Sequence, residues 1–321
     1  MSDTDRRYLR FLAEYALLQA FLFVLRCLPV RWAFGVADGL AWLIHHVAPR
    51  RLSRHRIARD NIRQAFGDQL TDQEIDRMIH GMWRHLCRLV CEMIQLPRRM
   101  RLSGCSEFLE FTGRERCVQA LLSGRPILFL GGHFGNWEMS VATFGHFGFP
   151  VAVVARKLDN PLLQEWFRQF RETKGNTLIL KHGAGTELVR TLERGGMVSL
   201  LCDQDAGRSG IFADFFGKPA STYKSIGLLA LQYDALVVVG GAYRLPPAAW
   251  PGCRWVRFSI TTQDVIDTRE FQGADGLSQL TQRFTLALEK MICSAPEQYF
   301  WLHRRWKTAA GDRRRKKKLA A

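Results

Sequence analysis

The chain lacks the cysteine patterns of small domains that are stabilised by disulfide bonds or by bound metal ions. Its 321 residues include eight cysteines, but these are scattered and no Cys-x-x-Cys pair occurs. This distribution indicates reduced thiols and excludes a small disulfide scaffold. Cys87 and Cys91, one helical turn apart and near His80 and His85, allow a metal site, although we favour buried packing thiols.

Sequence signatures of several other classes of protein are also missing. The sequence has no internal repeat, and no zinc-finger, RNP or helix-turn-helix motif accompanies its basic residues. No small-residue cleavage site closes the first apolar segment, so we do not expect a removed signal peptide. Acidic residues are fewer than basic ones. The chain has 30 Asp and Glu against 46 Lys and Arg, which gives a formal net charge of +16. Such a balance suits an anionic partner, whether nucleic acid, acidic lipid or an acidic carrier protein, and a basic surface without a partner is the alternative.

The amino-terminal residues are apolar, but they lack an unbroken run long enough to cross a bilayer, which takes about 20 residues. The run over 11–25 is interrupted by polar residues, and a second apolar stretch covers 32–47. We expect a membrane-associated helical segment over 1–50, either a tilted span or an in-plane anchor. A buried helix of a soluble protein is the alternative. The arginines of 50–63 favour a cytoplasmic location for the rest of the chain.

Beyond residue 50, strand-like apolar runs alternate with helical segments. This alternation predicts an α/β fold with a mixed, largely parallel central sheet flanked by helices. The predicted strands cover 108–111, 127–130, 150–155, 177–180, 197–202, 236–243 and 255–261. The predicted helices cover 71–95, 114–122, 137–147, 161–174, 185–193, 225–233 and 276–293, the first of them ending at Pro97. We assign 51–308 to one domain and 309–321 to a disordered basic tail.

The most informative motif follows the predicted strand over 127–130, where a glycine pair ends the apolar run. It reads Gly131-Gly132-His133-Phe134-Gly135-Asn136-Trp137-Glu138. A His at the carboxyl end of a strand reaches the crevice of an α/β sheet, and it exchanges a proton near neutral pH. We predict His133 as a general base and Glu138 as the acid that orients it. Five positions do not share a helix face, so His133 must lie in the turn; a helix-start His with an exposed Glu is the alternative.

Five segments resemble, in order, those of the bacterial acyltransferases that add secondary acyl chains to lipid A. They cover 59–66, 133–138, 156–161, 203–220 and 296–307. The resemblance implies transfer of a fatty acyl chain from an acyl carrier protein (ACP) or coenzyme A (CoA) thioester to a hydroxyl of a lipid A precursor or related glycolipid. It implies a location on the cytoplasmic face of the inner membrane, and no cofactor or metal besides the acyl-ACP or acyl-CoA co-substrate. The acceptor stays open, because related branches acylate phosphatidylinositol mannosides, aminolipids or lysophospholipids.

Two more predicted strands end in polar residues, Arg156 and Asp203, and parallel strands bring such ends to one crevice. We expect Arg156 to bind phosphate on the acceptor or the donor's phosphopantetheine arm. Asp203 is expected to order Arg156 or the acceptor sugar, and a turn carboxylate is the alternative. Asn136 and backbone amides near Gly135 are candidates for stabilising an oxyanion. The remaining substrate-binding candidates are Asp205 and Arg304, and the pair expected to contact lipid is Phe215 with Phe216.

Three rival functions are compatible with the residues. A metal-dependent phosphohydrolase would take as ligands His133, Glu138, Asp203 and Asp205. A thiol enzyme would use Cys202 as its nucleophile. A basic adaptor without catalytic activity would bind nucleic acid or anionic membrane through 50–63 and the tail.

Overall fold

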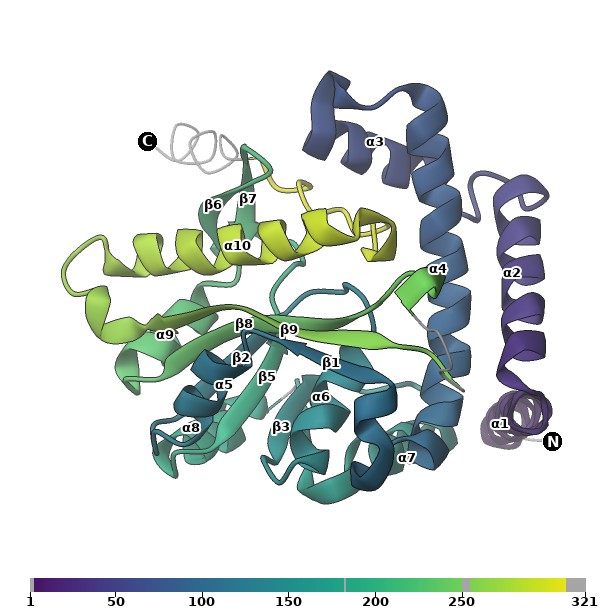
Figure 1. Cartoon of the computed structure of the whole chain (residues 1–321), viewed down its shortest axis with the longest axis horizontal. Coiled ribbons are helices and arrows are strands. Elements are labelled where there is room, and N and C mark those ends of the chain that lie inside the picture. The colour runs from purple at the N-terminus through teal and green to yellow at the C-terminus, as the bar shows by residue number, and fades with distance from the viewer. Residues whose placement is uncertain (1–2, 182, 250–254, 310–321) are drawn as a thin grey trace.

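A seven-stranded sheet forms the centre of the computed structural model, which describes residues 3–181, 183–249 and 255–309 (Figure 1). The strand order is β1-β9-β8-β2-β5-β3-β4, and every neighbouring pair is parallel except β8 with β9. The strands are β1 (Leu109–Thr112), β2 (Ile127–Gly131), β3 (Val151–Ala155), β4 (Thr177–Leu180), β5 (Met197–Leu201), β8 (Leu236–Arg244) and β9 (Phe258–Asp267). The predicted mixed, largely parallel sheet is therefore confirmed.

Helices cover both faces of this sheet and extend beyond one of its ends. They are α1 (Asp3–Cys27), α2 (Val30–His46), α3 (His55–Phe66), α4 (Asp72–Arg99), α5 (Arg114–Leu121), α6 (Trp137–His146), α7 (Pro161–Arg171), α8 (Ala184–Glu193), α9 (Lys224–Gln232) and α10 (Gly276–Ser294). In Figure 1, α10 lies on one face while α5 and α6 lie on the other. The predicted tail, except for residue 309, lies outside the described residues.

The central strands bring the functional loops to one edge of the sheet. All five residues of β2 are buried between β5 and β8, which explains why this strand is a continuous apolar run. Because β5 lies between β2 and β3 and all three are parallel, their carboxyl ends meet. The loops that follow them carry His133, Asp203 and Arg156, as the sequence predicted.

Two local predictions were wrong. Helix α4 continues through Pro97 to Arg99, because a proline in the last turn removes only one helical hydrogen bond. Phe215 and Phe216, the pair expected to contact lipid, lie at the turn of a hairpin formed by β6 (Ile211–Phe215) and β7 (Lys218–Thr222), which was not predicted. Phe215 is fully buried in the main core, so it is not a lipid contact, and Phe216 is half-buried against the same core.

The amino-terminal helices α1 and α2 leave many large apolar side chains exposed. Helix α1 is, within the described residues, the one helix long and apolar enough to cross a membrane, and α2 packs along α4 (Figure 1). Asn160, which caps α7, donates to the Phe11 carbonyl of α1 at 3.1 Å and to Glu14 at 2.9 Å. The exposed side chains are Leu9, Leu12, Leu17, Phe21, Phe23 and Val24 on α1, and Trp32, Val36, Leu40, Trp42 and Leu43 on α2.

A buried carboxylate joins four segments around the loop that follows β2. Glu92 of α4 is fully buried and accepts from Arg244 Nε at 2.5 Å and from Asn136 Nδ2 at 2.9 Å. Asn136 in turn caps α6 by accepting from the Met139 amide. The side-chain amide of Gln298 hydrogen-bonds both backbone groups of Arg244, at 2.9 and 2.8 Å. This network fixes the motif loop against α4, β8 and the carboxyl-terminal segment.

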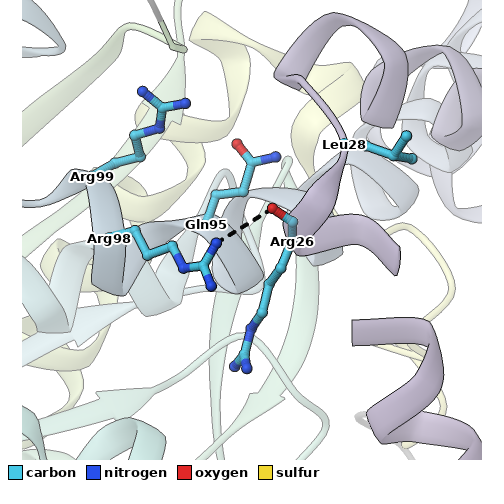
Figure 2. A pocket seen from close by; sticks show the side chains of 5 residues that line it. All are labelled: Arg26, Leu28, Gln95, Arg98 and Arg99. Atoms are coloured by element: carbon cyan, nitrogen blue, oxygen red, sulfur yellow. Dashed lines mark hydrogen bonds between the residues drawn. The ribbon is translucent and has the colours of Figure 1, made fainter. Parts of the chain in front are cut away.

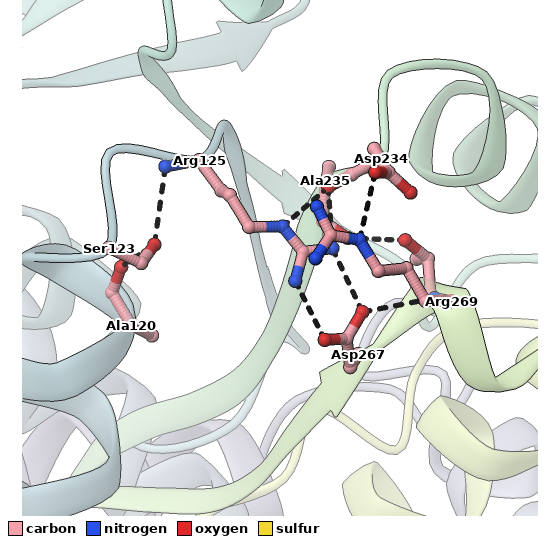
Figure 3. Close-up of polar contacts among 8 residues, drawn as sticks. Ala120, Ser123, Arg125, Asp234, Ala235, Asp267 and Arg269 are labelled. Atoms are coloured by element: carbon pink, nitrogen blue, oxygen red, sulfur yellow. Dashed lines mark hydrogen bonds and ion pairs between the residues drawn. The ribbon is translucent and has the colours of Figure 1, made fainter.

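We expect Glu92→Ala to destabilise the fold by about 3–5 kcal/mol, because it leaves the Arg244 charge buried without its partner. Chemical unfolding in detergent, followed by circular dichroism, measures this loss. The matched control is Arg269→Ala, which removes the exposed ion pair with Asp234 in the cluster of Figure 3 and should cost less than about 1 kcal/mol. Equal losses in the two variants would contradict the importance of the Glu92 network.

Candidate active site

His133 and Asp203 meet where β2 and β5 end. The Nδ1 atom of His133 lies 2.9 Å from Asp203 Oδ1, and the His133 backbone amide donates to Oδ2 at 2.8 Å. A carboxylate only accepts hydrogen bonds, so Nδ1 carries the hydrogen and Nε2 is left as the basic nitrogen. Asp203 is fully buried, whereas 19% of the His133 side chain is exposed. This pair therefore presents a fixed, accessible base at the edge of the sheet.

The charges around His133 strengthen it as a base. Burial alone would lower its pKa, but the Asp203 carboxylate, by charge and hydrogen bond, and the Glu138 charge raise the pKa above its ordinary value. Burial also opposes the charged form of Asp203, yet the contacts from His133 and the nearby His303 hold the Asp203 pKa well below its usual range. Asp203 thus stays ionised and stabilises the imidazolium that forms when His133 takes a proton.

A second imidazole, His303, completes the cluster from the carboxyl-terminal segment. That segment pairs with the motif loop, because the Phe300 amide donates to the His133 carbonyl at 2.8 Å and the Gly135 amide donates to the Gln298 carbonyl at 2.9 Å. The His133 and His303 rings lie edge to face with centroids 4.4 Å apart. Burial, together with the charge of His133, lowers the pKa of His303 to about 4 against the opposing pull of Asp203. His303 is therefore neutral at neutral pH.

Glu138 does not hydrogen-bond to His133, which corrects the predicted pairing. It lies in the first turn of α6, and both of its oxygens accept from Arg171 of α7, at 2.6 and 3.1 Å. Glu138 is buried, and the opposing charges of the pair raise the pKa of Arg171 although burial acts against it. The turn of five positions directs Glu138 away from the imidazole, so Asp203 is the acid that orients His133.

Comparisons with known proteins identify the family of the chain. The family model for bacterial lipid A biosynthesis acyltransferases matches residues 2–308. The chain belongs to this family. It is 29% identical over 205 residues to the lipid A biosynthesis lauroyltransferase of Escherichia coli (strain K12), which covers 63% of each chain. It is 28% identical over 258 residues to the palmitoleoyltransferase of the same strain, covering 79% of each.

The chain is also similar to an acyltransferase that is named for a different acceptor lipid. The phosphatidylinositol mannoside acyltransferase of Mycolicibacterium smegmatis is 24% identical over 299 residues, or 91% of each chain. The sequence-based assignment to an acyltransferase family is thus confirmed. His303 lies in the segment 296–307, which had already carried part of the resemblance, but its proximity to His133 had no signal in the sequence.

The predicted oxyanion donors of this acyltransferase are already engaged in the structure. Asn136 uses its side-chain amide on Glu92 and its backbone amide on the Ala242 carbonyl, at 2.9 and 2.6 Å. The Gly135 amide is bonded to Gln298, and its carbonyl lies 3.1 Å from His85 Nε2. With φ of +56°, Gly135 also approaches Ala242 too closely for any Cβ. Both residues therefore shape the loop, and the predicted oxyanion role is not supported.

The other predicted substrate-binding residues are Arg156, Asp205 and Arg304. Arg156 follows β3 at the same sheet edge and is exposed, but Asp203 pairs with His133 rather than with Arg156. Asp205 accepts from the Gly207 amide at 3.2 Å and from Thr308 Oγ1 at 2.9 Å. Arg304 is exposed, whereas the adjacent Arg305 is buried and donates to the Ser221 carbonyl. Arg156 and Arg304 are therefore the accessible cations of the predicted set.

The cysteines that the structure describes do not form a nucleophilic or metal-binding site. The seven cysteines within the described residues are free thiols. Cys202 is buried and its Sγ lies 3.3 Å from the Gly131 carbonyl, and burial raises the pKa of its thiol to about 12. Burial likewise raises the pKa values of Cys87 and Cys91 to about 11. These neutral thiols pack in the interior, as we favoured, and Cys202 is a poor nucleophile.

Two cavities border the amino-terminal helices and the motif helix. A cavity of about 190 Å³ lies between the ends of α1 and α4. Figure 2 shows the side chains that line it, which are Arg26, Leu28, Gln95, Arg98 and Arg99. A second cavity of about 110 Å³ is bordered by Glu138 and Arg171 and by apolar side chains that include Met100, Val141 and Phe170. The first concentrates positive charge next to the candidate membrane helix.

We expect Asp203→Asn to lower the pKa of His133, because the substitution removes the anion that stabilises the imidazolium. Nuclear magnetic resonance of histidine-labelled protein measures the titration over about pH 5 to 8, with the His303 signal expected to stay neutral throughout. The matched control is Asp205→Asn, whose carboxylate does not contact His133. A larger shift from Glu138→Gln than from Asp203→Asn would show that Asp203 is not the principal partner.

Proposed function

We propose that the protein transfers a fatty acyl chain from an ACP or CoA thioester to a hydroxyl group of a lipid A precursor or a related glycolipid. The observation that carries this proposal is the His133–Asp203 pair, in a chain of this family: buried Asp203 holds Nδ1 and leaves Nε2 as the basic nitrogen, on a side chain that is 19% exposed. A base held in one tautomer by a buried acid is the arrangement that activates a hydroxyl for acyl transfer.

The reaction needs no covalent enzyme intermediate, because a thioester is already activated. In the first step, His133 Nε2 takes the proton from the acceptor hydroxyl as its oxygen attacks the thioester carbonyl. Asp203 stabilises the imidazolium formed beside it. The tetrahedral intermediate then collapses, the carbon–sulfur bond breaks, and the leaving thiolate takes the proton from His133. The products are the acylated lipid and the free thiol of the donor.

Neighbouring residues supply distinct functions in this proposal. His303, neutral because its pKa is lowered to about 4, offers a ring hydrogen-bond donor near the reacting carbonyl without competing for the proton. The exposed Arg156 and Arg304 bind anionic groups of the donor or acceptor, for which the net charge of +16 is suited. The metal-hydrolase alternative is less favoured, because Glu138 is bonded to Arg171 and Asp205 to Thr308.

Membrane attachment in this proposal uses α1 and α2 as an in-plane anchor on the cytoplasmic face of the inner membrane. Support comes from α1, which is bonded to Asn160 near its start and buries Leu22 and Leu25 near its end. Helix α1 therefore contacts the rest of the protein along its length on one side, and its opposite side is free to contact lipid. Exposed Trp32 and Trp42 on α2 are side chains typical of a membrane interface. Arg26, Arg98 and Arg99 lie beside the anchor (Figure 2).

The test is acyl transfer in detergent micelles from labelled acyl-ACP or acyl-CoA to a lipid A precursor, with a phosphatidylinositol mannoside as the competing acceptor. We expect His133→Ala to lower kcat by about 10²–10⁴-fold and Asp203→Asn by about 10²-fold or more, because base and orienting acid act as a unit. Glu138→Gln should cost less than Asp203→Asn, since Glu138 contributes only charge at a distance.

Each result of this assay has a distinct meaning. Transfer abolished by Glu138→Gln but retained by Asp203→Asn would restore Glu138 as the orienting acid. Transfer that survives His133→Ala would overturn the mechanism, and a preference for the mannoside would overturn the lipid A acceptor. Activity abolished by a chelator and restored by a divalent cation would favour the metal-dependent alternative.

We expect Trp32→Glu to weaken binding to anionic phospholipid vesicles by about tenfold or more, because a charged side chain replaces an interfacial ring. Vesicle flotation of the purified protein measures the bound fraction. The matched control is Leu122→Glu, at a side chain that is 71% exposed, against 70% for Trp32, but lies after α5. Equal binding by the two variants would show that α2 is not part of the membrane-binding surface.

A further inference from the structure

Four of the nine histidines of the chain gather where α2, α3 and α4 meet, apart from the candidate active site. His45 and His46 end α2, His55 begins α3, and His80 lies on α4. The centroid of the His45 ring lies 4.6 Å from that of His46. The His45 ring also stacks on the His80 ring, with their centroids 5.0 Å apart. Together with Asp76 of α4, these residues form what we name the helix-junction cluster.

Two imidazoles of the helix-junction cluster aim at one carboxylate. His45 Nε2 lies 3.1 Å from Asp76 Oδ2, and His55 Nε2 lies 3.0 Å from Asp76 Oδ1. The three ligand atoms lie within 4.8 Å of one another. Four-coordinate zinc, with bonds of about 2.0–2.1 Å, holds its ligand atoms roughly 3.3 Å apart. The separations between Asp76 and the two imidazole nitrogens are already close to this spacing, so small shifts of the three side chains would let them surround an ion.

The surroundings of the cluster suit a divalent cation. Only 4% of the His45 side chain is exposed, whereas 46% of the Asp76 side chain is, so the ligands are fixed on one side and open to solvent on the other. Two ring nitrogens, His45 Nδ1 and His80 Nε2, are buried without a hydrogen-bond partner among the described residues.

We propose that His45, His55 and Asp76 bind a zinc ion, with water or His80 as the fourth ligand. Two imidazole nitrogens and one carboxylate oxygen are a set that zinc accepts, whereas magnesium and calcium prefer oxygen ligands alone. The ion would link the end of α2 and the start of α3, on either side of residues 47–54, to α4. It thereby fixes α3, whose Asn61 donates to the carbonyls of Trp301 and His303 at 2.7 and 2.6 Å. The metal site is thus a support for the segment that carries His303.

The test uses the full chain without a polyhistidine tag, stripped with a chelator and titrated with cobalt and zinc. All variants carry His303→Ala, because His133, Asp203 and His303 form a second group of possible ligands. We expect one cobalt per chain with the visible bands of a four-coordinate site, and zinc that displaces it. Saturating zinc should raise Tm by about 5 °C.

Variants of the cluster separate a metal site from a hydrogen-bonded one. We expect His55→Ala and Asp76→Asn to weaken zinc binding about tenfold or more, and His55→Cys, which restores a ligand, to retain it. The matched control is His46→Ala, which removes a ring from the same cluster without removing a ligand. Absence of saturable binding, or binding unchanged in His55→Ala, would overturn the proposal. Loss in His46→Ala equal to that in His55→Ala would also overturn it.

Discussion

The buried Glu92 carboxylate is the interaction on which the candidate active site depends most. It lies inside the protein, where it accepts hydrogen bonds from Arg244 and Asn136. Each of these two residues makes a further hydrogen bond to another segment. Asn136 caps α6, and Arg244 is held through its backbone by Gln298. Burying an ion pair rarely adds stability compared with apolar packing. Its function here is to hold four segments in one arrangement, so that the loop carrying His133 has a single conformation.

The sheet topology explains why the base and its acid come from distant parts of the sequence. Strand β5 enters the sheet between β2 and β3, and this insertion places Asp203 beside His133. The carboxyl-terminal segment then pairs with the motif loop through Phe134 and Tyr299 and brings His303 to the same place. The site is therefore assembled by long-range pairing, and α3 secures it from outside through Asn61.

The sequence was sufficient for the central sheet and most of its helices, but not for α3, for the β6–β7 hairpin or for the contacts within the candidate site. The apolar run of β2 ending in glycines predicted a buried strand followed by His133, and the polar residues after β3 and β5 were correctly expected at the same edge of the sheet. Glu138 was chosen for its closeness in sequence, although a spacing of five positions does not share a helix face. The order of strands in the sheet, which periodicity does not reveal, instead places Asp203 against His133. The β6–β7 hairpin was missed because Pro219 and Gly217 resemble loop residues.

The balance of charge around His133 has a chemical logic in the proposed reaction. The acceptor hydroxyl is a very weak acid, so a base of raised pKa takes its proton more readily. The cost is that a smaller fraction of the imidazole is deprotonated at neutral pH. Thioester chemistry tolerates this cost, because the leaving thiol is far more acidic than the attacking hydroxyl and needs little help to depart. A buried aspartate that strengthens the base thus assists the difficult half of the reaction, while the neutral His303 beside it keeps a second positive charge out of the site.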